Sequence, residues 1–140
     1  MIKSTYFYNK TDCLTLSDDS GFIVEEMESF PGIKTARVGN EMRGEQQVVN
    51  YIFSKNPKKQ KIDATFHCSL SLVGYKINQV VTGKVVGSII SSKKGNDGFG
   101  YDPFFIPQNS NKTFAEMGLK EKMFLSHRFE AFKTLSITQK

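Results

Sequence analysis

The sequence lacks several features that would place it at once in a broad class. No apolar run approaches the roughly 20 residues that a helix needs to cross a bilayer, and the polar start (Lys3, Ser4, Thr5) does not resemble a signal peptide. Two cysteines occur, Cys13 and Cys68, without metal-ligand spacing around them. Both lie in apolar, strand-like contexts, so we expect buried free thiols in a reducing cytoplasm.

Internal repeats, linkers and low-complexity segments are also missing, as are zinc spacing, a Walker-type loop and a nucleophile dyad. We therefore expect one domain over residues 1–140. Acidic residues are outnumbered, 14 against 19 Lys and Arg, which gives a net charge of +5. This excess favours a polyanionic partner without choosing between nucleic acid, an anionic surface and a small phosphorylated ligand. The densest basic segment, residues 55–61, is typical of a solvated turn.

Hydrophobic periodicity predicts a mixed α/β or α+β fold. We expect the end of a helix over residues 1–10, a strand over 12–17, extended chain over 22–24, a turn at 31–32, a helix from 40 to about 53, antiparallel strands over 64–72 and 79–90, a capping-box turn over 113–118, and a final helix capped by Ser126. The expected apolar helix faces are Met42, Val49, Ile52 and Phe53, then Phe129, Phe132 and Leu135. His67 points away from the apolar side of its strand, and we expect it to be exposed and without a role.

The segment from Gly95 to Pro107 has an unusual composition. Three glycines and two prolines rule out a helix interior and make a central strand unlikely. Five of its thirteen residues are nevertheless aromatic or branched apolar: Phe99, Tyr101, Phe104, Phe105 and Ile106. Such a loop can form the wall of a pocket for a flat, polar ligand. The alternative is a loop that packs over a small core of its own.

Asp18 and Asp19 stand side by side, where we expect a strand to end. Neighbouring side chains of a strand point to opposite faces, so one carboxylate could hold a hard cation such as Mg²⁺ while the other braces the loop. The metal-facing carboxylate could also orient or deprotonate water for attack on phosphorus. The alternative is an Asx-turn that ends the strand.

A basic cluster precedes and opens the final helix. His127 and Arg128 follow the cap residue Ser126, where free backbone N–H groups already favour anions, and Lys122 lies just upstream. Arginine adds a forked donor that suits phosphate or a carbonyl edge. The cluster is therefore a candidate ligand site, although a chance grouping of basic residues would look the same.

Four segments resemble the inosine triphosphate pyrophosphatases, also called non-canonical purine NTP pyrophosphatases. They are Leu16–Gly21, Phe30–Gly32 with Thr35–Arg37, Gly98–Phe105, and Glu121–Lys122 with Ser126–Arg128. The resemblance implies a mixed α/β fold of two lobes around a central cleft, usually as a homodimer. It implies hydrolysis of ITP, dITP or XTP to the monophosphate and pyrophosphate with Mg²⁺.

The same resemblance assigns roles to individual residues. Asp19 corresponds to the catalytic base and metal carboxylate, and Ser20 to a substrate contact. The base-binding loop corresponds to Phe99, Gly100, Tyr101 and Asp102, and the remaining substrate contacts to Lys122, His127 and Arg128. Donors from His127 and Arg128 would pair with a 6-oxo group, whereas adenine would leave them unpaired.

The chain also departs from this family. Family members begin with a strand and a Thr/Ser-Gly-Asn-x-x-Lys phosphate loop, and Met1-Ile2-Lys3 aligns instead with a later helix. We therefore expect an N-terminally truncated chain whose turnover is impaired. The alternative function is a non-catalytic fragment that binds nucleotides through the base pocket, or, less expected, nucleic acid through the basic surface.

Overall fold

The computed structural model describes residues 2–137 and contains a five-stranded antiparallel sheet in the order β2-β1-β3-β4-β5. The elements are α1 (Ile2–Thr11), β1 (Thr15–Val24), the 3₁₀ turn η1 (Glu25–Met27), β2 (Phe30–Gly32), α2 (Thr35–Glu41), α3 (Glu45–Lys55), β3 (Lys61–Gly74), β4 (Ile77–Ile90), β5 (Phe105–Pro107), α4 (Leu119–Leu125) and α5 (His127–Ile137). The predicted mixed α/β class is confirmed. The expected helix over residues 1–10 is present from Ile2, and Met1 lies outside the described residues.

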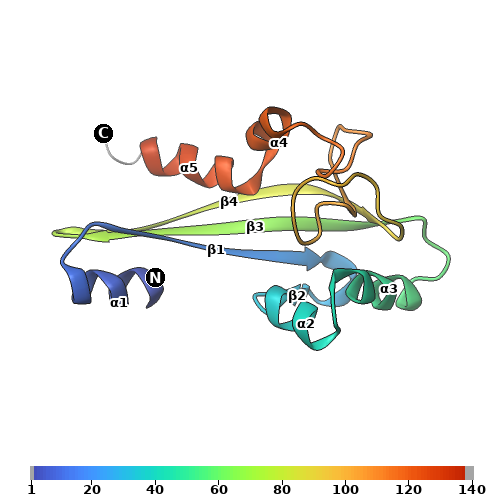
Figure 1. Cartoon of the computed structure of the whole chain (residues 1–140), viewed down its shortest axis with the longest axis horizontal. Helices are drawn as coiled ribbons and strands as arrows, with labels where there is room; N and C mark the ends of the chain where they lie inside the picture. Colours follow the sequence, from blue (N-terminus) through green and yellow to red (C-terminus); the bar gives the residue numbers. More distant parts are fainter. Residues whose placement is uncertain (1, 138–140) are drawn as a thin grey trace.

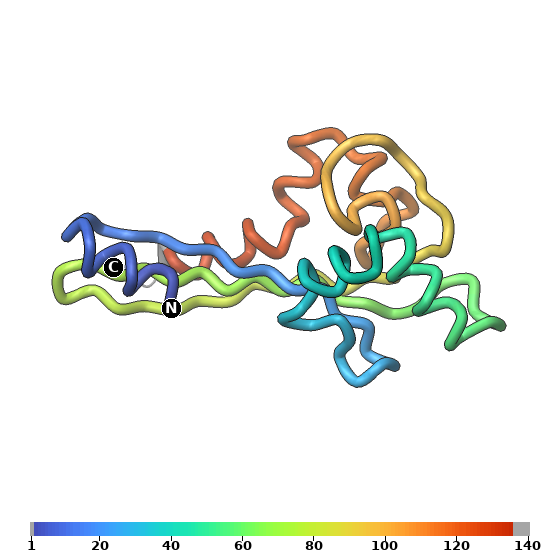
Figure 2. Tube along the Cα trace, turned by 60° about the horizontal axis from the view of Figure 1, so that its bottom comes forward, coloured from blue at the N-terminus to red at the C-terminus, as the bar shows by residue number. Residues whose placement is uncertain are grey.

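Three long strands form the frame of the molecule (Figure 1). β3 and β4 pair antiparallel along their whole lengths, as the period-two pattern predicted, and β1 pairs with β3 from Thr15 to Val24. Helices α1 and α5 lie on opposite sides of these strands (Figure 1). The tube view shows the loop that follows β4 beside α2 and α3, at the end of the molecule opposite to α1 (Figure 2).

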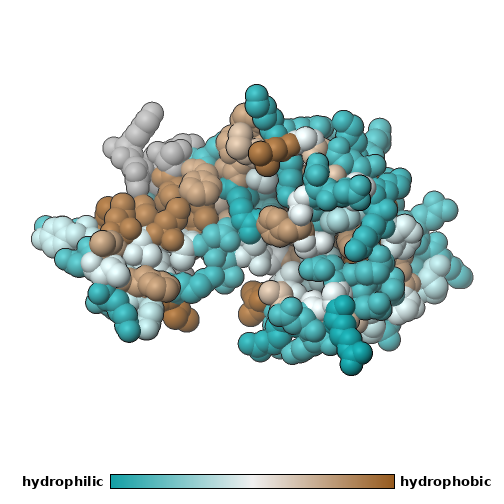
Figure 3. All heavy atoms as spheres, in the orientation of Figure 1, coloured by the Kyte–Doolittle hydropathy of each residue, from teal (hydrophilic) through white to brown (hydrophobic). Residues whose placement is uncertain are grey.

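Apolar side chains are buried in two clusters. The larger one contains Phe22, Phe66, Phe104 and other residues of the sheet, the loop after β4, and α3. The smaller one lies under α5, where Ala131 and Leu135 pack against Cys68, Leu70, Leu72 and Val81. Other large apolar side chains are exposed. Figure 3 shows hydrophobic surface at the end that holds α1 and the β3–β4 turn, and also over α4.

Several sequence predictions were wrong in detail. β1 is continuous through Asp18 and Asp19, so these residues lie inside a strand and not in a turn at its end. Pro31 and Gly32 belong to β2. The helix expected from Asn40 to Phe53 is two helices, because the chain leaves helical geometry before Gly44, whose φ of 120° favours glycine.

For the final helix, the prediction that Ser126 is the N-cap is confirmed, and the prediction that Phe132 belongs to the buried face was wrong. The Ser126 hydroxyl accepts the Phe129 N–H at 3.2 Å, as an N-cap does. Phe132 is exposed rather than buried, because α5 turns Ala131 and Leu135 to the sheet.

Helix α4 was not predicted at all. Cys13 is exposed, whereas Cys68 is buried as expected.

His67 is partly buried, not fully exposed. Among residues 2–137, none of the helices combines the length and apolar composition that crossing a membrane would require.

Candidate functional site

The main cavity of the described residues lies where the Gly95–Pro107 loop, β1 and the start of α5 meet, and its volume is about 900 Å³. Eight of the nine residues predicted for the site line it: Ser20, Phe99, Gly100, Tyr101, Asp102, Lys122, His127 and Arg128. They are up to 108 positions apart in the sequence. The fold therefore brings together residues that three separate segments supply.

The loop is held in shape by Asp102. This carboxylate is buried, and it accepts the Phe99 N–H at 2.7 Å and the Lys122 Nζ at 2.5 Å. Gly98 has a φ of +82°, and a Cβ there would lie 2.2 Å from the Asp102 carboxylate. Only glycine suits this close approach, which explains the glycine at this position of the loop. In this structure Asp102 pairs with protein groups, so its observed contacts hold the loop and Lys122 in place.

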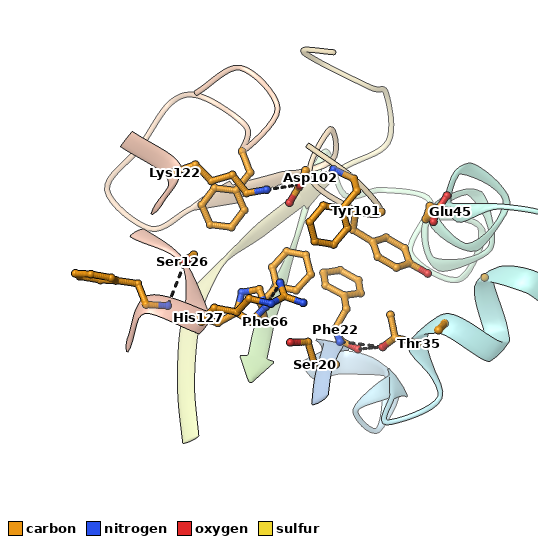
Figure 4. A pocket seen from close by; sticks show the side chains of 18 of the residues that line it. Ser20, Phe22, Thr35, Glu45, Phe66, Tyr101, Asp102, Lys122, Ser126 and His127 are labelled. Carbon is orange, nitrogen blue, oxygen red and sulfur yellow. Dashed lines mark hydrogen bonds and ion pairs between the residues drawn. The ribbon is translucent and has the colours of Figure 1, made fainter. Parts of the chain in front are cut away.

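Aromatic rings form the floor of the cavity (Figure 4). Tyr101 stacks on Phe22 with ring centroids 4.6 Å apart and planes at 9°, and His127 stacks on Phe66 at 5.0 Å and 10°. Phe99, by contrast, is 67% exposed. The Lys122 ammonium and the Arg128 guanidinium lie over its ring, 5.0 Å and 5.5 Å from the centroid. A flat ligand with negative charge would find both apolar faces and cations here.

Buried polar atoms without partners lie along the same wall. Among the described residues, Ser20 Oγ, Tyr101 Oη and His127 Nδ1 have no hydrogen-bond partner. Burial, with a smaller contribution from the charge of Arg128, lowers the pKa of His127 to about 4. Burial also raises the pKa of Tyr101. Both side chains are therefore neutral near pH 7 and can offer hydrogen bonds to an uncharged ring.

Of the nine predicted site residues, Asp19 is the one that does not lie at the cavity. It does not line the cavity, and its carboxylate lies 3.5 Å from Lys3 of α1. Its neighbours Asp18 and Ser20 face the α5 side, where Asp18 pairs with Arg128. The expectation that adjacent carboxylates point to opposite faces is thus fulfilled, whereas the expectation that the strand ends at these residues was wrong. Asp19 is 80% exposed.

A second wall of the cavity was not found from the sequence. It is formed by Thr35, Ala36, Gly39, Asn40, Arg43, Gly44 and Glu45 of α2, α3 and their junction. The Thr35 hydroxyl anchors this wall to β1, because it accepts the Phe22 N–H at 2.9 Å and donates to the Gly32 carbonyl. Thr35 and Ala36 belong to one of the four segments of the family resemblance, and that was the available signal. The others carry no local pattern that marks them.

The cavity thus combines stacked aromatic rings with the cationic side chains of Lys122 and Arg128, and comparisons with known proteins identify the family. A profile of the Ham1 family matches residues 1–137. The chain is similar to the dITP/XTP pyrophosphatase of Campylobacter jejuni serotype O:2, with 37% identity over 134 residues that cover 94% of this chain and 66% of the relative. It is also similar to the enzyme of the same name from Zymomonas mobilis, with 38% identity, 96% coverage of this chain and 66% of the relative.

Solved structures agree. The Ham1 protein of Staphylococcus aureus superposes with a TM-score of 0.84 and 31% identity, covering 98% of this chain and 72% of that one. A Ham1 protein from Coxiella burnetii gives a TM-score of 0.84 with 27% identity, covering 99% of this chain and 73% of that one. The chain belongs to the Ham1 family, which confirms the ITPase-like resemblance. It spans about two thirds of the length of these curated relatives.

Proposed function

We propose that this chain hydrolyses non-canonical purine nucleoside triphosphates, such as ITP, dITP and XTP, to the monophosphate and pyrophosphate. The observation that carries the proposal is the single cavity in which all eight expected substrate contacts meet. Relatives that match nearly the whole chain are named dITP/XTP pyrophosphatases.

The purine base would enter between the exposed Phe99 ring and the floor of the cavity. The floor would supply apolar contact, and His127 and Arg128, which line the cavity, would supply donors for a 6-oxo group. Adenine places an amino donor at the same position and would leave those donors unpaired, at a cost of about 1–3 kcal/mol. Selection of an oxo purine over ATP follows from this difference.

Asp19 would act on the phosphate chain and not on the base. Within the described residues, β2 pairs with β1 only from Phe22 to Val24, so no strand covers the outer edge of β1 at Asp19. To reach Asp19, a triphosphate that leaves the cavity past Ser20 would cross this edge beside the Lys3 ammonium, which donates to the Asp18 carbonyl at 2.7 Å. Asp19 could there orient or deprotonate the attacking water.

Mg²⁺ is the cofactor that this chemistry implies. The described residues contain no group of three or more His, Cys, Asp or Glu side chains that could hold a metal ion. Mg²⁺ is commonly bound mainly by substrate phosphates, with one or two protein carboxylates. Asp19 is exposed and would supply that carboxylate. When bound, Mg²⁺ would neutralise charge on the phosphates.

The test is pyrophosphate release from ITP in the presence of Mg²⁺, compared with release from ATP. We expect preference for ITP and a large loss of kcat in Asp19→Asn. Asp63→Asn, which removes an exposed carboxylate of β3, is the matched control and should behave as the parent. Equal rates on ITP and ATP, or an unchanged rate in Asp19→Asn, would contradict the proposal.

A second candidate function is nucleotide binding without turnover, and the separation of Asp19 from the cavity favours it. Saturable ITP binding in calorimetry, without pyrophosphate release, would identify this case. A homodimer and a cytoplasmic location are further proposals, which rest on the family and on the two free thiols. Sedimentation would test the first and fractionation the second.

A further inference from the structure

Asp18 forms a network that links three elements beside the cavity. Its Oδ2 accepts the Arg128 Nε–H at 3.0 Å and the Cys68 thiol at 3.2 Å, and its Oδ1 accepts from Arg128 Nη2 at 3.4 Å. These residues belong to β1, α5 and β3. Two nitrogens of the guanidinium are thus fixed by one carboxylate, a geometry that sets the plane of the arginine fork.

The third nitrogen of Arg128 points at the neighbouring histidine. Its Nη1 lies 3.3 Å from His127 Nε2. A guanidinium has donors and no acceptor, so His127 Nε2 must be the acceptor in this contact. Since burial lowers the pKa of His127 to about 4, the ring is neutral near pH 7. Its one proton therefore resides on Nδ1.

The His127 ring has little freedom to change this arrangement. It is 6% exposed and stacked on Phe66. Its Nδ1 has no acceptor among the described residues, although the side chain lines the cavity. A buried donor without a partner is costly, and a ligand acceptor would remove that cost.

We propose that Asp18 is a positioning residue, which acts through Arg128 to hold His127 in the Nδ1–H tautomer. The cavity wall then offers a hydrogen-bond donor where the other tautomer would offer an acceptor. A donor suits the carbonyl oxygen of an oxo purine and does not suit an amino group, so the network would sharpen the choice of base. This inference rests on the proposed function for its effect on substrates, but not for the tautomer itself.

The tautomer can be measured without any activity. The sequence has two histidines, and ¹⁵N shifts of labelled imidazoles distinguish the Nδ1–H from the Nε2–H form. We expect His127 to be in the Nδ1–H form in the parent and to shift toward Nε2–H in Asp18→Asn and in Arg128→Ala. His67 provides an internal reference. Glu130→Gln is the matched control, because it removes a carboxylate of the same helix that pairs with Lys133.

Kinetics test the consequence for the substrate. In Asp18→Asn we expect the ITP-over-ATP ratio of kcat/KM to fall about five-fold, a value typical of a partly exposed ion pair, mainly through KM for ITP. In an Arg128→Ala background, Asp18→Asn should have no further effect, because Asp18 acts through Arg128. A carboxylate that only stabilised the fold would lower kcat/KM for both nucleotides equally in either background.

An Nε2–H tautomer of His127 in the parent, or an unchanged tautomer in Asp18→Asn, would overturn the inference. So would an Asp18→Asn effect on ITP of the same size with and without Arg128. If the parent neither binds nor hydrolyses ITP, the proposed function is wrong, and the ¹⁵N shifts still decide whether Asp18 sets the tautomer.

Discussion

Replacing Gly83 by alanine should force α5 away from the sheet. Gly83 is buried in β4, directly opposite Cys68 of β3, at the point where α5 crosses the strands. A Cβ at this position would lie 2.2 Å from the His127 carbonyl oxygen and 2.3 Å from the Ala131 nitrogen. Ordinary contact begins at 3.4 Å, so the helix has to retreat by more than 1 Å.

Both atoms belong to helix backbone, which cannot rotate aside as a side chain would. Overpacking of this kind costs about 1–3 kcal/mol, and we expect the upper part of that range because neither element can yield locally. Moving α5 also moves His127 and Arg128, so the KM for ITP should rise together with the loss of stability.

Urea unfolding followed by circular dichroism measures the free energy of unfolding. The matched control is Gly39→Ala in α2, where a Cβ meets nothing within 4 Å and φ is not positive. That substitution should stabilise the chain by up to about 1 kcal/mol, since alanine favours a helix interior. If the free energy of unfolding of Gly83→Ala lies within about 0.5 kcal/mol of that of the parent, α5 does not pack closely against Gly83.

Three further predictions concern buried groups. Lys122→Met should lower the free energy of unfolding measured in urea by about 3 kcal/mol, because Asp102 keeps a buried charge without its cation. An unchanged midpoint of urea unfolding would show that water solvates the Asp102 carboxylate. The pKa of His127 is lowered from 6.5 to about 4, so the unfolded state binds more protons between these values, and stability should fall as pH drops from 6.5 to 4. In thermal melts, the melting temperature of His127→Gln should not show this dependence on pH. If it falls with pH as steeply as that of the parent, His127 is not the group responsible. Iodoacetamide at pH 8 should label Cys13 and spare Cys68, whose pKa burial raises to about 11, and mass spectrometry of the native chain should find one adduct; rapid labelling of both would refute the burial.

The sequence by itself determined the parts that local rules govern. The alternation of Phe66, Cys68 and Leu70 predicted β3, and the hydroxyl of Ser126 predicted the start of α5. The composition of the Gly95–Pro107 loop predicted a pocket wall, because rigid glycine turns and aromatic rings are rarely combined in a solvated loop.

Only the tertiary structure decided which side of β1 each carboxylate occupies. Asp18 and Asp19 look alike in the sequence, and the continuous pairing of β1 with β3 sends one toward Arg128 and the other toward Lys3. The second wall of the cavity, from Thr35 to Glu45, also depends on long-range packing. Contacts between residues far apart in the chain leave no periodic trace in either segment, so local pattern could not predict them.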